Sequence, residues 1–497
     1  MTFKRASLIA AFAASNLAAC ATFDLSPQPK PLPVERAASS CSEWVAAVDG
    51  VVTSAGVNDA GAYHVPGFPY LRVDRFTASF AQQALNDSGL FEAWAREGRA
   101  LDREGRSIEL QNLPATNLAE IGAATTEVAA ARTESCANEL MASDFRDPAV
   151  RARAVANARV PDDYIDVNRV IGLYPIAYPV FAAGVARWHA EAVDAFREYA
   201  ANRQARGPVV RYAPPAGKML SQNEVAALIE RAPRDRLGKI LPEAEQLERL
   251  FESFAPVFEV ENGSDSDAIG ALAWRSQTHP FVERSRPVVY VRLAYTRYGG
   301  EVLPQLVYTA WFPERPSVSA FDILAGMLDG VVFRVTLARD GAPLVYDSVH
   351  PCGCYHMFFP TGRVRETASP RPGDEWSFVP AAAPALQAGQ RIVLHVQSRT
   401  HYLTGFGMDA GDGTFTYGFQ DDNVLRSLPL PGGGRRSVYA ADGLIAGTER
   451  PERMLFWPMG VPSAGTMRQW GHHATAFLGR RHLDDPDLIE RRFAPAP

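Results

Sequence analysis

The segment from His350 to His356 places reactive side chains at regular spacing. Histidine or cysteine stands at every second position, as His350, Cys352, Cys354 and His356. Alternate side chains of an extended strand share one face, so a strand here would present all four together. Imidazole and thiolate groups suit zinc or copper, and a tetrahedral site takes four of them. A straight strand would hold the two ends about 20 Å apart. The spacing therefore predicts a metal site only if the intervening proline and glycine let the segment turn.

Two other arrangements of these residues remain open. Some of the groups can bind a metal with distant histidines that the fold brings in, namely His401, His472, His473 or His482. Alternatively, Cys352 and Cys354 form a disulfide. Cysteines two residues apart in an extended chain lie near the upper separation for a bridge, so this one would be strained and easily reduced. The segment thus predicts a metal centre, a structural disulfide or a redox-active thiol pair.

A second dense group of polar side chains lies near the C-terminus. His472 and His473 are adjacent, and His482, Asp484 and Asp485 follow. Neighbouring side chains on regular structure point in different directions, so the two adjacent histidines are not expected to ligate one metal together. One of them can pair with Asp484 or Asp485 as an acid/base couple, because histidine titrates near neutral pH. The alternative is an aromatic core with these groups in a hydrogen-bonded surface.

The first twenty residues, MTFKRASLIAAFAASNLAAC, have the order of a secretory signal. A basic start with Lys4 and Arg5 precedes an apolar stretch and small residues. The run Leu17–Cys20 resembles the lipobox of bacterial lipoproteins. This resemblance implies removal of residues 1–19, acylation of Cys20 and a membrane-anchored location. By similarity to enterobacterial lipoproteins, Ala21 indicates sorting to the outer membrane, with the protein facing the periplasm.

The residues that follow are expected to be a tether. Residues 20–40 hold four prolines in near alternation, at positions 27, 29, 31 and 33. Such a run favours an extended, semi-rigid polyproline II spacer. The chain carries a formal net charge of −6, which argues against a nucleic-acid partner and against adsorption to anionic lipid. Attachment to the membrane is therefore expected through the lipid itself.

The expected compartment also bears on the cysteines. Cysteines in an oxidising compartment pair unless something protects them. The simplest set of pairs joins Cys41 to Cys136 and Cys352 to Cys354, with pairing between the two sets as the alternative. Closing a loop of about 95 residues between Cys41 and Cys136 contributes roughly 4–5 kcal/mol in the chain-entropy model.

The pattern of the chain changes near residue 265 and predicts an α+β protein. Residues 41–264 are expected to form an α-helical domain. Helix starts are indicated at Asp74, at Asp147-Pro148, at the Ser221–Glu224 capping box and at Pro242. The stretch 174–179, with prolines at 175 and 179, is expected to be a rigid loop packed against a sheet.

Residues 265–497 are expected to form a mainly antiparallel β-rich domain. Runs of β-branched and aromatic residues between glycine and proline turns predict its strands. These runs are residues 288–298, 302–312, 331–337, 391–398 and 414–419. Gly299-Gly300 has the spacing of a two-residue hairpin turn. No long helical crossover separates the runs, so antiparallel pairing is the simplest outcome.

Two classes of function fit these features. No G-x-S-x-G, H-E-x-x-H, G-x-x-x-x-G-K-[ST] or G-x-G-x-x-G motif is present in the sequence. The first hypothesis is therefore a lipid-anchored envelope protein that acts as a binding or structural module for another envelope protein or a glycan. The second is a metal-binding or redox-active envelope protein or enzyme, with its site on residues 350–356 and the C-terminal histidines and with zinc or copper as the metal.

The lipobox yields a direct test. In the Cys20→Ser variant we expect a protein that carries no lipid, because the acylated thiol is gone. Labelling with a radioactive fatty acid and fractionation of the envelope measure this outcome. A Cys20→Ser protein that still labels and still fractionates with the outer membrane would contradict the lipobox prediction.

Overall fold

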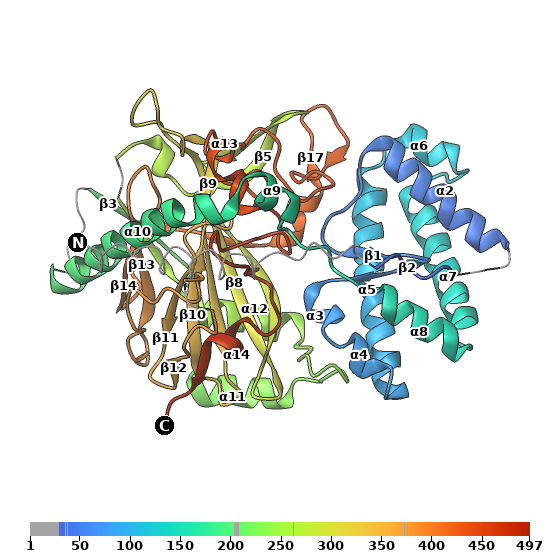
Figure 1. Cartoon of the computed structure of the whole chain (residues 1–497), viewed down its shortest axis with the longest axis horizontal. Helices are drawn as coiled ribbons and strands as arrows, with labels where there is room; N and C mark the ends of the chain where they lie inside the picture. The colour runs from blue at the N-terminus through green and yellow to red at the C-terminus, as the bar shows by residue number, and fades with distance from the viewer. Residues whose placement is uncertain (1–28, 35, 37, 203–207, 262, 372) are drawn as a thin grey trace, which may run out of the picture.

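The computed structural model describes residues 29–34, 36, 38–202, 208–261, 263–371 and 373–497 (Figure 1). The expected signal peptide (residues 1–19), Cys20 and the first part of the proline-rich tether lie outside the described residues. The chain has an α+β fold, with helices between residues 40 and 254 and mainly antiparallel sheets from residue 257 onward, as the sequence predicted.

The N-terminal part is a helical bundle with one small hairpin, and Figure 1 shows it beside the larger β-rich part. The helices are α2 (Ser40–Ala55), α3 (Arg75–Ala78), α4 (Ala81–Ala84), α5 (Ser88–Asn112), α6 (Ala115–Glu120), α7 (Thr126–Asp144) and α8 (Pro148–Asn157). The hairpin pairs β1 (Tyr63–Val65) with β2 (Phe68–Val73). Asp74 caps α3 by accepting a hydrogen bond from the Thr77 amide at 2.7 Å, and Pro148 opens α8 after Asp147. Both predicted helix starts are confirmed.

The core of this bundle is aromatic and aliphatic. Trp44, Val48, Trp94 and Leu110 are buried in it. A disulfide between Cys41 of α2 and Cys136 of α7 joins two helices across it, with 4.8 Å between the Cα atoms. The predicted pairing of these two cysteines is thus present in the structure.

The larger part is built on two sheets that enclose one core. The six-stranded sheet has the order β11-β10-β9-β8-β7-β16, and the five-stranded sheet has the order β14-β13-β4-β3-β15. The first contains β7 (Val288–Tyr298), β8 (Glu301–Arg315), β9 (Gly326–Leu337), β10 (Pro343–Val349), β11 (Met357–Pro360) and β16 (Gly418–Asp421). The second contains β3 (Val209–Ala213), β4 (Val257–Glu261), β13 (Arg391–Val396), β14 (Leu403–Asp409) and β15 (Phe415–Thr416). Phe258 and Leu394 from one sheet share a core cluster with Tyr308 and Phe333 from the other.

The predicted strands and turn are largely confirmed. The predicted run 288–298 is strand β7, and Tyr298 pairs with Glu301 across Gly299-Gly300, the predicted hairpin turn. The predicted run 414–419 is split between β15 and β16, which belong to different sheets. The predicted boundary near residue 265 falls within the five-stranded sheet, because β3 and β4 precede it and β13 follows it. Hydropathy pattern alone did not reveal these two short strands between helices.

Helices flank the sandwich. They are α9 (Asp166–Ile171), α10 (Tyr174–Asn202), α11 (Gln222–Arg231) and α12 (Ala244–Phe254). The predicted capping box before α11 is present, with Ser221 and Glu224 bonded reciprocally. The predicted loop at residues 174–179 is wrong, because these residues form the first turns of α10. Pro175 occupies the first turn, where amide groups lack an intrahelical partner, so only Pro179 removes a helical hydrogen bond.

The last sixty residues wrap the sandwich with little regular structure. They include α13 (Arg453–Phe456), the 3₁₀ turn η3 (Trp457–Met459), α14 (Leu488–Arg492) and β19 (Phe493–Pro495), which pairs with β12 (Val364–Glu366). Small two-stranded units are completed by β5 (Ala271–Ser276) with β6 (His279–Glu283) and by β17 (Leu428–Pro429) with β18 (Arg435–Arg436). Within the described ranges, no helix combines the length and apolar character needed to span a bilayer.

The disulfide between α2 and α7 gives a stability test. Replacing both cysteines, as Cys41→Ser with Cys136→Ser, should lower the free energy of unfolding by about 2–5 kcal/mol, because the unfolded chain regains freedom and buried polar groups appear. Urea unfolding followed by circular dichroism measures the change. Dithiothreitol should destabilise the wild-type protein and leave the double variant unaffected. Equal stability of the oxidised and reduced wild-type protein would contradict the prediction.

Candidate functional site

The segment 350–356 forms the loop of the β10–β11 hairpin and is not an extended strand. The chain reverses here, since Ser348 pairs with Met357. Within the loop, the His350 amide donates to the Cys354 carbonyl at 3.0 Å, and the Gly353 amide donates to the His350 carbonyl at 2.8 Å. Gly353 has a φ of +89°, and a Cβ there would lie 2.4 Å from the Ala474 carbonyl oxygen. The metal prediction required the segment to turn, and it turns at Gly353, but the turn carries His350 and His356 to different partners.

The two histidines of the loop bind different carboxylates. Nδ1 of His350 lies 3.2 Å from Oδ1 of Asp329, and Nε2 of His356 lies 2.9 Å from Oδ2 of Asp347. Asp347 is also held by two hydrogen bonds from Arg334. Among the described residues, no group of three or more histidine, cysteine, aspartate or glutamate side chains is arranged to hold a metal ion. The described residues therefore do not bring His350, Cys352, Cys354 and His356 together as the ligands of one zinc or copper ion.

The two cysteines of the loop are free thiols. Cys352 is buried in a cluster with Trp311 and Met467, and Cys354 packs against the same cluster and also lines a cavity. The Cys354 amide donates a hydrogen bond to the Cys352 sulfur at 3.4 Å, and the two thiols are themselves in hydrogen-bond contact. The predicted Cys352–Cys354 bridge is absent, and so is pairing with Cys41 or Cys136, which bond to each other.

Asp329 is the centre of a buried charged network behind this loop. Its carboxylate contacts His350, Nδ1 of His401 at 3.0 Å and Nη2 of Arg450 at 3.4 Å. His401 also contacts Asp267 through Nε2 at 3.4 Å. Burial alone would raise the pKa of Asp329, but Arg450 and the two histidines hold it well below its usual range. Burial alone would lower the pKa of His401, but the two aspartates raise it above its usual range.

Backbone strain is concentrated around the same network. Leu328, Tyr355, Arg399 and His401 have φ values of 56°, 63°, 68° and 51°. Bulky residues rarely adopt this left-handed region, and such strain clusters at functional sites because the surrounding structure must hold it. Leu328 precedes Asp329, and Tyr355 lies in the hairpin loop. The strained residues thus lie at or near the β10–β11 loop, which forms one wall of a cavity.

That wall encloses a cavity of about 860 Å³ beneath helix α10. Its lining is mostly aromatic and aliphatic. It includes Phe181, Val185 and Trp188 from α10, Leu455 and Phe456 from α13, Trp376 and Phe378 from the chain between these helices, and Phe477 and Leu478 from the segment after α13. Val180 and Leu455 line the cavity and are 74% and 56% exposed, so the mouth opens between α10 and α13.

The surface around the mouth is also apolar. Large exposed side chains gather on α9, on the start of α10 and on the α13–η3 segment. They are Val167, Val170, Ile171, Leu173, Ile176, Val180, Met454, Leu455 and Trp457. These elements pack against one another, as the close approach of Gly172 to Pro458 shows. Scattered exposed apolar residues are ordinary, but a gathered patch of this kind indicates an interaction site.

Glu452 is the most deeply buried carboxylate of the cavity without a side-chain partner, whereas Asp374, which also lines it, is half-buried. Glu452 is 4% exposed, and its carboxylate makes no hydrogen bond or ion pair with any described residue. Burial raises its pKa to about 7, against the attraction of Arg450 and Arg315. A buried polar group without a partner is costly, and a carboxylate with a raised pKa in a cavity is a typical functional group.

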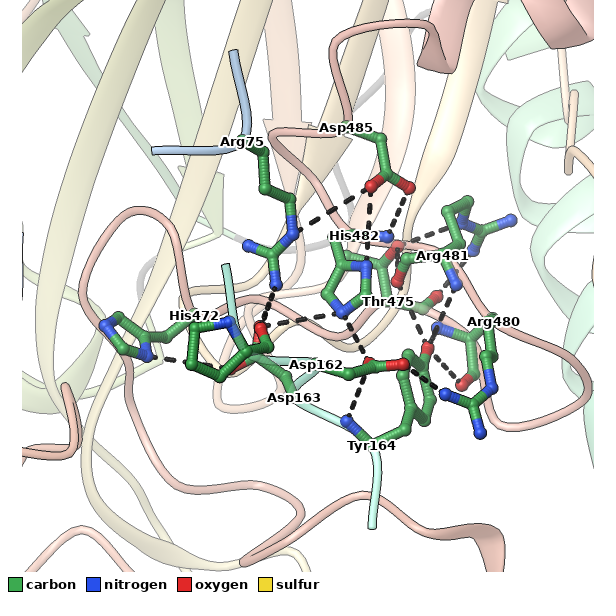
Figure 2. A network of polar contacts seen from close by, with 12 residues as sticks. Arg75, Asp162, Asp163, Tyr164, His472, Thr475, Arg480, Arg481, His482 and Asp485 are labelled. Atoms are coloured by element: carbon green, nitrogen blue, oxygen red, sulfur yellow. Dashed lines mark hydrogen bonds and ion pairs between the residues drawn. The ribbon is translucent and has the colours of Figure 1, made fainter. Parts of the chain in front are cut away.

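The C-terminal histidines lie elsewhere, in a charged cluster that joins the helical and β-rich parts (Figure 2). His482 contacts Asp162 at 3.2 Å and Asp485 at 3.4 Å. Arg75 of the helical bundle contacts Asp163 at 2.7 Å and Asp484 at 3.1 Å. The predicted use of Asp484 by an acid/base couple is thus replaced by an ion pair with Arg75.

The two adjacent histidines do different things. Nδ1 of His472 lies 3.1 Å from the Tyr63 hydroxyl and 3.5 Å from Asp163, and its Nε2 lies 2.8 Å from the Ala60 carbonyl oxygen. His473 is buried, and burial lowers its pKa to about 3, so the ring is neutral. His472 and His482 contact residues 60–63 of the helical part and residues 162–163, which is a structural arrangement.

The sequence analysis missed the residues that make the cavity distinctive. Glu452, Tyr355 and Tyr402 come together from three separate segments, and no local spacing marks them. The only sequence signal was the density of histidine and cysteine at residues 350–356. A comparison of the chain with protein-family models, curated proteins and solved structures found no match in any of the three. Inference about function therefore rests on the geometry of this cavity.

The charged cluster of Figure 2 predicts a dependence of stability on pH. Burial alone would lower the pKa of His482, but Asp162 and Asp485 raise it to about 9. A raised pKa stabilises the fold fully below the unfolded value of about 6.5, and this stabilisation is lost as the pH rises toward 9. The contribution is on the order of 3 kcal/mol. Urea unfolding at pH 6 and pH 9 measures it.

The variant His482→Gln should be less stable at pH 6 and should lose most of the decline toward pH 9. A matched control is His279→Gln, because His279 is exposed on β6. That variant should keep the wild-type decline. A decline that persists unchanged in His482→Gln would show that another group causes it.

Proposed function

We propose that the protein is a lipid-anchored protein of the bacterial outer membrane, facing the periplasm, that binds an apolar small molecule in the cavity beneath α10. The single observation that carries the proposal is this cavity of about 860 Å³ with its aromatic and aliphatic lining. Ligand pockets for small molecules have volumes of about 300–1,000 Å³, mostly apolar walls and a few polar groups. The cavity fits that description.

The lining favours an apolar ligand over a glycan. Sugar hydroxyl groups need hydrogen-bond partners when they are buried. The walls contributed by Phe181, Val185, Phe456 and Phe477 offer no polar side-chain atom. Burial of apolar ligand surface contributes roughly 25 cal/mol per Å², so contact with such walls is the main source of affinity.

The mouth of the cavity supports a ligand that comes from the membrane. The exposed apolar side chains of α9, α10 and α13 surround the opening, so an apolar molecule stays in contact with apolar surface as it enters. An anchor at Cys20 would keep the protein close to a bilayer. The later part of the predicted tether is not a spacer, because Leu32 bonds to Asn157 and Arg36 pairs with Asp144 on the helical bundle. The anchor and the cavity then serve one process, in which the protein takes an apolar molecule from the membrane.

A pair of substitutions on α10 tests the cavity. Gly184 lines it, and a Cβ added there meets no atom within 4 Å, so a side chain can be placed without a clash. The Gly184→Trp variant should weaken binding of the neutral fluorescent probe N-phenyl-1-naphthylamine at least tenfold, because the indole fills the opening. A fluorescence titration measures the dissociation constant.

The neighbouring position supplies the control. Ala183 is exposed on the same helix and does not line the cavity. The Ala183→Trp variant should therefore bind the probe as the wild-type protein does, although it carries the same added ring. Absence of saturable binding to the wild-type protein, or equal binding by both variants, would contradict the proposal.

A further inference from the structure

Some charged side chains of the cavity already form hydrogen bonds with other groups of the protein, and others do not. Nη1 of Arg481 donates to the carbonyls of Glu375 and Trp376, each at 3.0 Å, and its other nitrogens donate to Thr475. The Glu375 carboxylate accepts hydrogen bonds from the amides of Phe477 and Leu478 at 2.7 and 2.9 Å. Both groups are engaged by the fold. The buried Glu452 carboxylate, by contrast, has no such partner among the described residues.

His356 is not available to a ligand in the same way. Burial lowers its pKa to about 3, so the ring is neutral and carries one proton. Its Nε2 lies 2.9 Å from the Asp347 carboxylate, which can only accept, so the proton is on Nε2. The His356 side chain has no accessible surface, so Nδ1 does not face the cavity. Glu452 is therefore the group on which a ligand's charge would act.

Aromatic rings stand beside Glu452. The ring of Tyr355 lies 5.2 Å from that of Trp188 and 4.5 Å from that of Tyr402, measured between centroids. All three rings line the cavity, and the charge of Glu452 acts on the Tyr355 hydroxyl. Aromatic faces attract cations, and such contacts strengthen when water is excluded.

The two arginines near Glu452 are held by contacts with other groups of the protein. Arg450 donates to the carbonyls of Leu324 and Leu328 at 2.8 and 3.0 Å and contacts Asp329. Arg315 lies over the ring of Tyr402 at 5.0 Å. Neither arginine lines the cavity or forms an ion pair with Glu452. The place beside the Glu452 carboxylate is therefore open to a charge brought by a ligand.

We infer that the ligand of this cavity is an amphiphile with an ammonium group, a long-chain amine or a lipid-like cation, whose charged end binds Glu452 and whose apolar body occupies the cavity. This inference rests on the proposed function and names its ligand class. The ammonium group donates to Glu452, and the rings of Trp188, Tyr355 and Tyr402 line the same cavity. The aliphatic chain lies toward Phe181 and Phe456, at the mouth.

A series of ligands with one body and three head groups tests the ligand class. Decylammonium, 1-decanol and decanoate compete with N-phenyl-1-naphthylamine for the purified chain at pH 8, below the concentrations at which they form micelles. We expect decylammonium to bind at least tenfold more tightly than decanol, and decanoate to bind most weakly. If decanol binds and decylammonium binds no better, the ligand class is wrong and the proposed apolar-ligand function stands. If none of the three displaces the probe, the proposed function itself fails.

Two glutamine substitutions identify the group responsible. Glu452→Gln should bind decylammonium and decanol about equally, with unchanged affinity for decanol, which also shows that the variant is folded. Glu449→Gln removes the same charge from an exposed glutamate three residues away and should keep the wild-type preference. A preference for decylammonium that survives Glu452→Gln would overturn the assignment to Glu452, and the wild-type series remains decisive if that variant does not fold.

Discussion

The buried carboxylate of Asp329 holds together the segments that form the cavity wall. Asp329 lies on β9 and is fully buried. Its partners come from three different places, because His350 is on the β10–β11 loop, His401 is between β13 and β14, and Arg450 is in the C-terminal segment. A buried charge is tolerated only when it is paired and hydrogen-bonded, and removal of one partner leaves the others uncompensated. The positions of these segments are therefore coupled through one group.

This coupling explains why strained backbone persists next to the cavity. A non-glycine residue in the left-handed region costs of order 1–3 kcal/mol. Tyr355 and His401 both adopt it. The ring of Tyr355 packs against that of Tyr402, and His401 is hydrogen-bonded to Asp329. The result is that Tyr355 and Tyr402 meet with 2.8 Å between their hydroxyl oxygens. The Asp329 network thus stabilises a geometry that these segments would not adopt alone.

Local patterns in the sequence predicted the elements that local physics determines. The strand at residues 288–298, the Gly299-Gly300 turn and the Ser221–Glu224 capping box were all visible because each depends on neighbours in the chain. The pairing of Cys41 with Cys136 followed from the expected compartment and the small number of cysteines. These features required no knowledge of the tertiary fold.

The errors arose where tertiary contacts decide the outcome. The alternating spacing at residues 350–356 resembled a strand, but the hairpin reverses there, so His350 and His356 reach different aspartates. Pro175 and Pro179 suggested a loop, but Pro175 lies in the first turn of α10, where a missing amide costs little, and the helix continues through Pro179. The importance of Glu452 could not be predicted, since it depends on a cavity built from distant segments.

The unpartnered Glu452 is the feature that packing alone does not explain. Its burial is unfavourable, because the charged form loses water and the neutral form leaves hydrogen-bonding capacity unused. An apolar residue of similar size would remove that cost, and the aromatic walls would pack against it as well. The nearby Arg450 is already bonded to backbone carbonyls, so Glu452 is not needed to neutralise it. A carboxylate that destabilises the empty fold gains a physical rationale once a ligand supplies the donor, because the cost in the free protein then becomes selectivity in the complex.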